Sequence, residues 1–79
     1  MAYNGHRSKA YWNVSLWINN DEGLYRTALD LCRRMNRREA AMTMYDMLKD
    51  GAAPDSTPTT PDGYAYSIDK IQRAMIGLT

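Results

Sequence analysis

Apolar side chains recur at helical spacing along most of this sequence, and this periodicity restricts the chain to an all-α fold. The first such segment spans about residues 8–19, where apolar residues three and four positions apart share one face of a helix. The same spacing returns over about residues 20–35, 37–50 and 67–77, and no segment alternates convincingly between apolar and polar residues as a strand does. We therefore predict a compact four-helix single domain.

Short polar residues mark the expected helix starts. The predicted N-caps are Ser8, Asn20, Asn36 and Ser67. Asp21 and Glu22 then fall in the first turn of the second helix, where carboxylates meet the positive end of the helix dipole. Glu39 follows Asn36 by three positions, which resembles a capping box at the start of the third helix.

The aromatic stretch from Tyr11 to Arg26 is expected to contribute to the core and not to a ligand site. Trp17 shares a helix face with Val14 and Ile18, so we predict that it is buried. Asn13 lies in the middle of the same helix and, if buried, has to bond the backbone of a neighbouring segment, so we interpret it as a structural clamp. Methionines are expected to fill gaps in the core: Met35, Met42, Met44, Met47 and Met75.

Residues 51–63 differ from the helical segments because they hold three prolines and no large apolar residue. This composition predicts a long Pro-rich loop before the last helix. Loops of this length are either functional or mobile, and we favour a mobile loop. Tyr64 and Tyr66 then return the chain to the core in an extended conformation.

The residue types exclude several classes of function. Cys32 is the only cysteine in 79 residues, so no disulfide forms within one chain, and with a single histidine we expect no structural zinc. His6 has no catalytic partner in a known motif, and we predict no enzyme activity, no cofactor and no small-molecule substrate. Short apolar runs and the lack of a signal-peptide pattern predict an intracellular protein without a membrane segment.

Two charged surfaces remain as candidate binding sites. The first is an acidic face of the third helix, extended by aspartates of the adjoining loop: Glu39, Asp46, Asp50, Asp55 and Asp62. The alternative is an arginine cluster at the second inter-helix break: Arg33, Arg34, Arg37 and Arg38. This cluster suggests a helix-turn-helix DNA reader, but acidic residues on the third helix would face phosphates unfavourably. A net charge of +1 also argues against a DNA-coating protein and against a DNA mimic.

The segment AYNGHRSKAYWNVSLWINNDEGLYRTA resembles the N-terminal signature of a family of small proteins of phages and mobile elements. That signature runs as YNG, a short gap and TWNVxLWxxNDExLY. The matching positions are Trp12, Asn13, Val14, Leu16, Trp17, Asn19 or Asn20, Glu22, Leu24 and Tyr25. The sequence departs from the signature at Tyr11, where threonine is usual, and at His6, where an aromatic is common.

The whole chain also resembles a type I-C anti-CRISPR protein. This resemblance implies a non-enzymatic inhibitor that binds the crRNA-guided surveillance complex (Cascade) and prevents it from engaging target DNA. It implies a phage or mobile-element protein that acts in the bacterial cytoplasm on subunits of Cascade. We expect a monomer or weak dimer that does not bind DNA directly. Because a DNA path is lined with lysine and arginine, we expect Asp46 and Asp50 to matter more for binding than Arg33 and Arg34.

Overall fold

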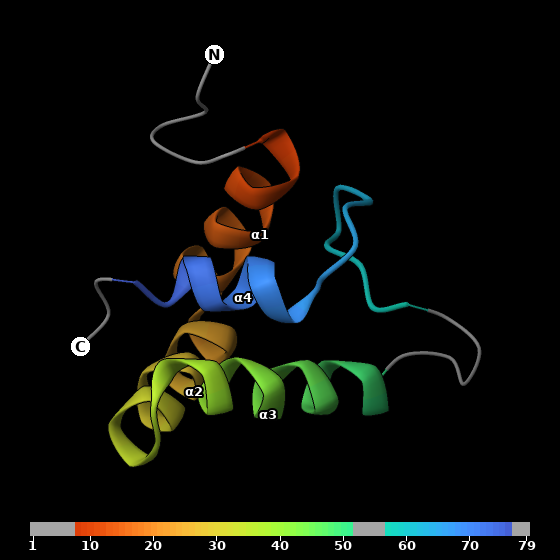
Figure 1. Ribbon diagram of the computed structural model, residues 1–79. Coiled ribbons are helices and arrows are strands. Elements are labelled where there is room, and N and C mark those ends of the chain that lie inside the picture. Colours follow the sequence, from red (N-terminus) through yellow and green to blue (C-terminus); the bar gives the residue numbers. More distant parts are fainter. Residues whose placement is uncertain (1–7, 52–56, 77–79) are drawn as a thin grey trace.

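The computed structural model describes residues 8–51 and 57–76, and these form a single all-α domain, as predicted (Figure 1). The helices are α1 (Lys9–Asn20), α2 (Glu22–Arg34), α3 (Arg37–Asp50) and α4 (Ile68–Ala74). Each helix packs against two others, because α4 contacts α1 and α3 while α2 contacts the same two. Asp55 and the last residue of the predicted fourth helix lie outside the described residues.

The helix starts follow the predicted caps with one difference. Asp21, and not Asn20, caps α2, since its Oδ1 accepts the Leu24 N–H at 3.0 Å. Asn20 is instead the last residue of α1, and the Asp21 N–H bonds the Trp17 carbonyl at 3.0 Å. The extended residue Asp21 thus ends α1 and caps the start of α2. The sequence does not show this, because Asn19, Asn20 and Asp21 are all residue types that cap helices well.

The last helix is shorter than the spacing predicted. It ends at Ala74, where the Met75 N–H is shared between the carbonyls of Ile71 at 3.0 Å and Gln72 at 3.2 Å, and the Ile76 N–H bonds the Arg73 carbonyl, three residues back, at 3.3 Å. The tighter turn still keeps Met75 fully buried.

One contiguous core joins all four helices. Its largest fully buried side chains are Ile18, Met44, Ile71, Met75 and Val14. The expectation of a core role is wrong for Met42 and Met47, which are 46% and 51% exposed on the outside of α3. It is also wrong for Trp17, which is half-buried and lies outside the core cluster.

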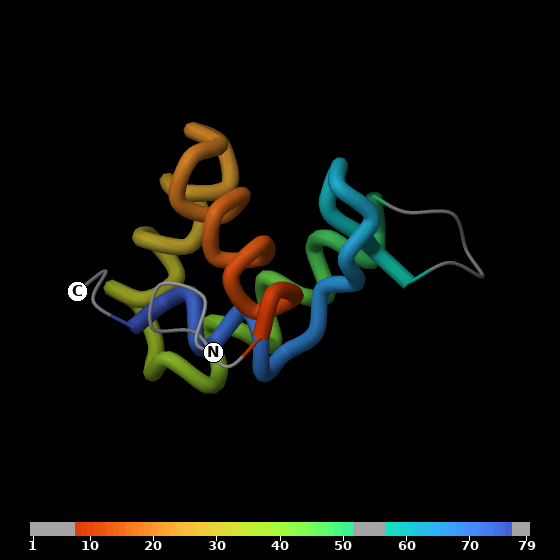
Figure 2. The backbone as a smooth tube through the Cα atoms, turned by 90° about the horizontal axis from the view of Figure 1, so that it is seen from above, coloured from red at the N-terminus to blue at the C-terminus, as the bar shows by residue number. Residues whose placement is uncertain are grey.

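The described part of the predicted loop contains a hydrogen-bonded turn. The Gly63 N–H bonds the Thr60 carbonyl and the Thr60 N–H bonds the Tyr64 carbonyl, both at 2.8 Å. Thr59 and Ala65 form an isolated antiparallel bridge, and Gly63 takes a φ of 91°, which favours glycine. The sequence Thr-Pro-Asp-Gly is typical of such a turn. The ribbon and the backbone tube both place this turn (cyan) on the side of the molecule where α3 ends (Figures 1 and 2).

Candidate interaction surfaces

Asn13 connects α1 to the turn. It is 3% exposed, and its Oδ1 accepts the Thr60 hydroxyl at 2.7 Å while its Nδ2 donates to Asp62 Oδ2 at 2.8 Å. The prediction of a structural clamp is therefore confirmed, although the partners are side chains and not backbone groups. Since Thr60 is also 3% exposed, the contact satisfies two buried polar groups at once.

Trp17 adds a second donor to the same carboxylate. Its indole Nε1 donates to Asp62 Oδ2 at 2.9 Å. Hydrogen bonds from Asn13 and then Trp17 lower the pKa of Asp62. Desolvation opposes them to a smaller extent, and the charge of Lys9 adds the smallest effect, which also lowers the pKa. Asp62 is thus a carboxylate at neutral pH. We call Asn13, Trp17, Thr60 and Asp62 the α1–turn clamp.

The α1–turn clamp gives Asp62 partners within the fold. Its carboxylate accepts two hydrogen bonds from α1, although the residue itself is exposed. The clamp joins positions 45 to 49 residues apart, which helical spacing cannot reveal. Two local signals could have found it: a mid-helix asparagine in need of a partner, and a Pro-Asp-Gly turn that positions an aspartate.

The remaining acidic side chains of α3 are exposed. We define the α3 outer face as Glu39, Met42, Asp46, Met47 and Asp50. Asn36 Oδ1 accepts the Glu39 N–H at 2.8 Å, which is the capping half of the predicted box, but Glu39 Oε1 accepts the Asn36 side-chain N–H at 3.2 Å and not its backbone N–H. Within residues 8–51 and 57–76, Asp46 and Asp50 form no hydrogen bond or ion pair through their side chains. They lie one helical turn apart, beside the two exposed methionines.

The arginine cluster is partly neutralised within the molecule. Arg34 Nε pairs with Asp30 Oδ2 at 3.2 Å. Arg38 Nη1 bonds Asp69 Oδ1 at 2.8 Å and Gln72 Oε1 at 3.1 Å, which ties α3 to α4. The other two arginines, Arg33 and Arg37, are exposed and make no ion pair in the described part of the chain.

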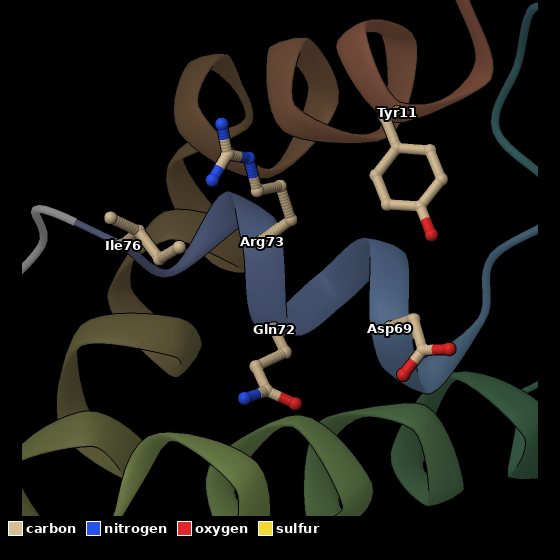
Figure 3. A pocket seen from close by; sticks show the side chains of 5 residues that line it. All are labelled: Tyr11, Asp69, Gln72, Arg73 and Ile76. Atoms are coloured by element: carbon tan, nitrogen blue, oxygen red, sulfur yellow. The ribbon is translucent and has the colours of Figure 1, made fainter. Parts of the chain in front are cut away.

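A groove with a mixed lining lies along α4, beside its contact with α1. It is formed by Tyr11, Asp69, Gln72, Arg73 and Ile76 (Figure 3). Asp69 and Gln72 are already held by Arg38, so two of its polar groups are engaged within the fold. A second groove lies between the end of α3 and the turn, and its lining includes Leu48, Thr59 and Tyr66.

Other chemistry has little support in the described residues. Burial raises the pKa of the Cys32 thiol despite the nearby charge of Arg37, so this lone thiol stays protonated at neutral pH. No three His, Cys, Asp or Glu side chains gather there as a metal site. None of the described helices is long and apolar enough to span a membrane.

The fold and its surfaces define a small all-α domain with an internally satisfied polar clamp and a charged outer helix face. The chain belongs to a family of unknown function, DUF7249, whose model matches residues 1–77. Comparison with curated proteins and with solved structures gave no match.

Proposed function

We propose that this protein is a non-enzymatic inhibitor that binds the type I-C surveillance complex and blocks its access to target DNA. The proposal starts from the resemblance of the sequence to a type I-C anti-CRISPR protein. The observation that carries it is the α3 outer face, where the unpaired carboxylates of Asp46 and Asp50 lie beside the exposed Met42 and Met47. Such a mixture of acidic and apolar groups suits a basic protein surface.

The charges of this face favour a protein partner over a nucleic acid. Asp46 and Asp50 would meet phosphates as like charges, whereas the lysines and arginines along a DNA path would attract them. An inhibitor that occupies that path competes with DNA directly. It needs only a local acidic surface for this, which agrees with a net charge of +1 for the whole chain.

The same charges disfavour self-association through α3. A two-fold contact sets the same patch of both copies against itself, so the carboxylates of Glu39, Asp46 and Asp50 would face their own kind. We therefore expect the protein to act as a monomer or weak dimer. From the resemblance we also propose that it is encoded by a phage or mobile element and acts in the cytoplasm of the bacterial host.

A pull-down with purified type I-C Cascade tests the proposal. We expect the complex to capture the protein, and prior loading of target DNA to reduce the capture. The double variant Asp46→Lys/Asp50→Lys should weaken binding at least about fivefold, because it turns two attractive contacts into repulsive ones. Arg33→Glu/Arg34→Glu serves as the matched charge reversal and should have less effect.

Two outcomes would overturn the proposal. If Cascade captures none of the protein, the inhibitor function is wrong. If the arginine reversals abolish capture while the aspartate reversals leave it unchanged, the interface lies at the arginine cluster. Affinity for naked DNA that falls steeply with salt would instead favour a DNA-binding regulator that uses those arginines.

A further inference from the structure

Exposure divides the methionines of α3. Met42 and Met47 are 46% and 51% exposed, whereas Met44, which lies between them in sequence, is 1% exposed and belongs to the core. A thioether reacts with peroxides at a rate that follows its accessibility. Met42 and Met47 are therefore the methionines of this helix that a peroxide reaches without any opening of the fold.

The other described methionines are protected. Met75 is fully buried in the core that joins the four helices. Met35 is half-buried, and its sulfur accepts the Thr43 hydroxyl at 3.5 Å, which engages a lone pair that an oxidant would attack. Oxidation of the folded protein is thus directed to the outside of α3, and the core keeps its packing.

Met42 lies between two carboxylates of the α3 outer face. Glu39 precedes it by three positions and Asp46 follows it by four, and residues at these spacings are neighbours on a helix surface. Met47 directly follows Asp46, so it points about 100° away around the helix axis, at the edge of the face. Met42 is thus the apolar group that a partner bound to Asp46 would cover.

We propose that Met42 is a site of reversible oxidation by hydrogen peroxide, and that the sulfoxide formed there weakens the binding of a partner to the α3 outer face. The effect on binding rests on the proposed function. In the reaction, the sulfur of Met42 attacks one oxygen of the peroxide, the O–O bond breaks, and the second oxygen leaves as water. The sulfur is oxidised, the peroxide is reduced, and the protein neither gains nor loses protons overall.

The sulfoxide changes what this part of the face offers a partner. Methionine presents apolar surface, whereas its sulfoxide is polar and carries an oxygen that accepts hydrogen bonds. Glu39 and Asp46 cannot supply them, because an ionised carboxylate is an acceptor only. A bound partner therefore buries the new oxygen without a donor, or gives it a donor that would otherwise pair with a carboxylate. Both arrangements weaken binding.

The first experiment measures the order of oxidation. The folded chain is exposed to dilute hydrogen peroxide, the reaction is stopped with catalase, and trypsin then releases the peptide 39–49, which carries Met42, Met44 and Met47 together. Fragmentation of this peptide in a mass spectrometer locates the added oxygen. We expect Met42 and Met47 to oxidise at least about fivefold faster than Met44, because a buried sulfur reacts only when the fold opens. Equal rates at Met42 and Met44 would overturn the proposal.

The second experiment measures capture by purified type I-C Cascade. The protein is treated alone and freed of peroxide before it meets the complex, so that only its own methionines change. We expect capture of the treated wild type to fall at least about threefold, and methionine sulfoxide reductase to restore it. The melting temperature should stay unchanged, because the buried methionines remain reduced.

Two matched variants locate the effect, and each is compared with its own untreated form. Leucine is apolar, similar in size to methionine and free of sulfur, so peroxide should change the capture of Met42→Leu by less than about twofold. Met47→Leu, at the other exposed methionine of α3, should still lose capture at least about threefold. Loss of capture in treated Met42→Leu, or resistance of Met47→Leu, would overturn the assignment of the effect to Met42.

The outcomes separate this inference from the proposed function. If Cascade captures the untreated and the oxidised protein equally, the function stands and the inference is wrong. If Cascade captures neither, the proposed function is wrong and the effect on binding falls with it, whereas the order of oxidation is measured on the free protein.

Discussion

Asp62 and Asp46 are the same residue type in opposite situations. Asp62 lies in a turn far from α1 in sequence, yet Asn13 and Trp17 donate to its carboxylate at 2.8 and 2.9 Å. Asp46 lies on the outer face of α3, as does Asp50, and neither carboxylate has a partner in the described part of the chain. All three are exposed, so what distinguishes Asp62 is the two hydrogen bonds that it accepts from α1.

The two regions place polar groups in different roles: those of the α1–turn clamp bond one another, whereas the carboxylates of Asp46 and Asp50 are available to a partner. In the α1–turn clamp, a buried amide and a buried hydroxyl satisfy each other, so removal of either leaves an unpaired group inside the protein. At Asp46 and Asp50 on the α3 outer face, a substitution leaves no buried group unpaired, because both carboxylates are exposed to water. Stability measurements should thus respond to the first region and binding measurements to the second.

The largest expected effect on stability is that of Asn13→Ala. The substitution leaves the Thr60 hydroxyl without its acceptor and removes one of the donors to Asp62, so we expect a loss of about 1–3 kcal/mol in the free energy of unfolding. Urea denaturation followed by circular dichroism measures it. Asn20→Ala, at an exposed asparagine, is the control and should change the free energy by less than about 0.5 kcal/mol. Equal losses in the two variants would show that the clamp does not stabilise the fold.

Trp17→Phe is expected to have a smaller effect. Phenylalanine keeps an aromatic ring but lacks the N–H that bonds Asp62, so the loss should be about 0.5–1.5 kcal/mol. Trp12→Phe removes an indole N–H that makes no hydrogen bond within the described residues, and it should cost less. Thermal unfolding of both variants makes the comparison. A larger shift for Trp12→Phe would contradict the role given to Trp17.

The pH dependence of stability is expected to show the smallest effect of the clamp. The pKa of Asp62 is lowered in the folded state, so its contribution is fully present above the unfolded pKa of about 4 and is lost as the pH falls through the folded value. Asp62→Asn should therefore flatten the decline of stability in acid. Urea titrations of wild type and this variant between about pH 6 and pH 3 measure the slopes. Identical slopes for wild type and Asp62→Asn would show that Asp62 adds nothing.

The sequence predicts the four helices because each needs only local information. Apolar spacing indicates which faces are buried, and the capping roles of Ser8, Asn36 and Ser67 follow from residue type and position. The same rules leave the α1–α2 junction ambiguous, since Asn19, Asn20 and Asp21 are all good caps. Which of them acts depends on where α1 ends, and that is decided by packing of the whole domain.

The candidate site is less predictable because it depends on contacts between distant segments. Asn13 could be identified as needing a partner, but Thr60 and Asp62 come from a segment that composition alone describes as a loop. Trp17 was expected in the core because its neighbours on the helix are apolar, whereas its N–H reaches Asp62 at the surface. Spacing on α3 correctly places Glu39, Asp46 and Asp50 on an exposed face. It does not show that the end of α3 forms a groove with the turn.

The central claim is that the α1–turn clamp stabilises the fold and the α3 outer face binds the partner. The most direct test compares how two variants bind purified type I-C Cascade under conditions in which both are folded. Asn13→Ala lowers stability but leaves the α3 outer face intact, whereas Asp46→Lys/Asp50→Lys changes that face without touching the core. We predict that the Asn13 variant keeps its affinity within about twofold and that the aspartate variant loses at least about fivefold, with an unchanged melting temperature. The opposite pattern, with binding lost in the Asn13 variant and kept in the aspartate variant, would contradict the assignment of the clamp to structure and of α3 to binding.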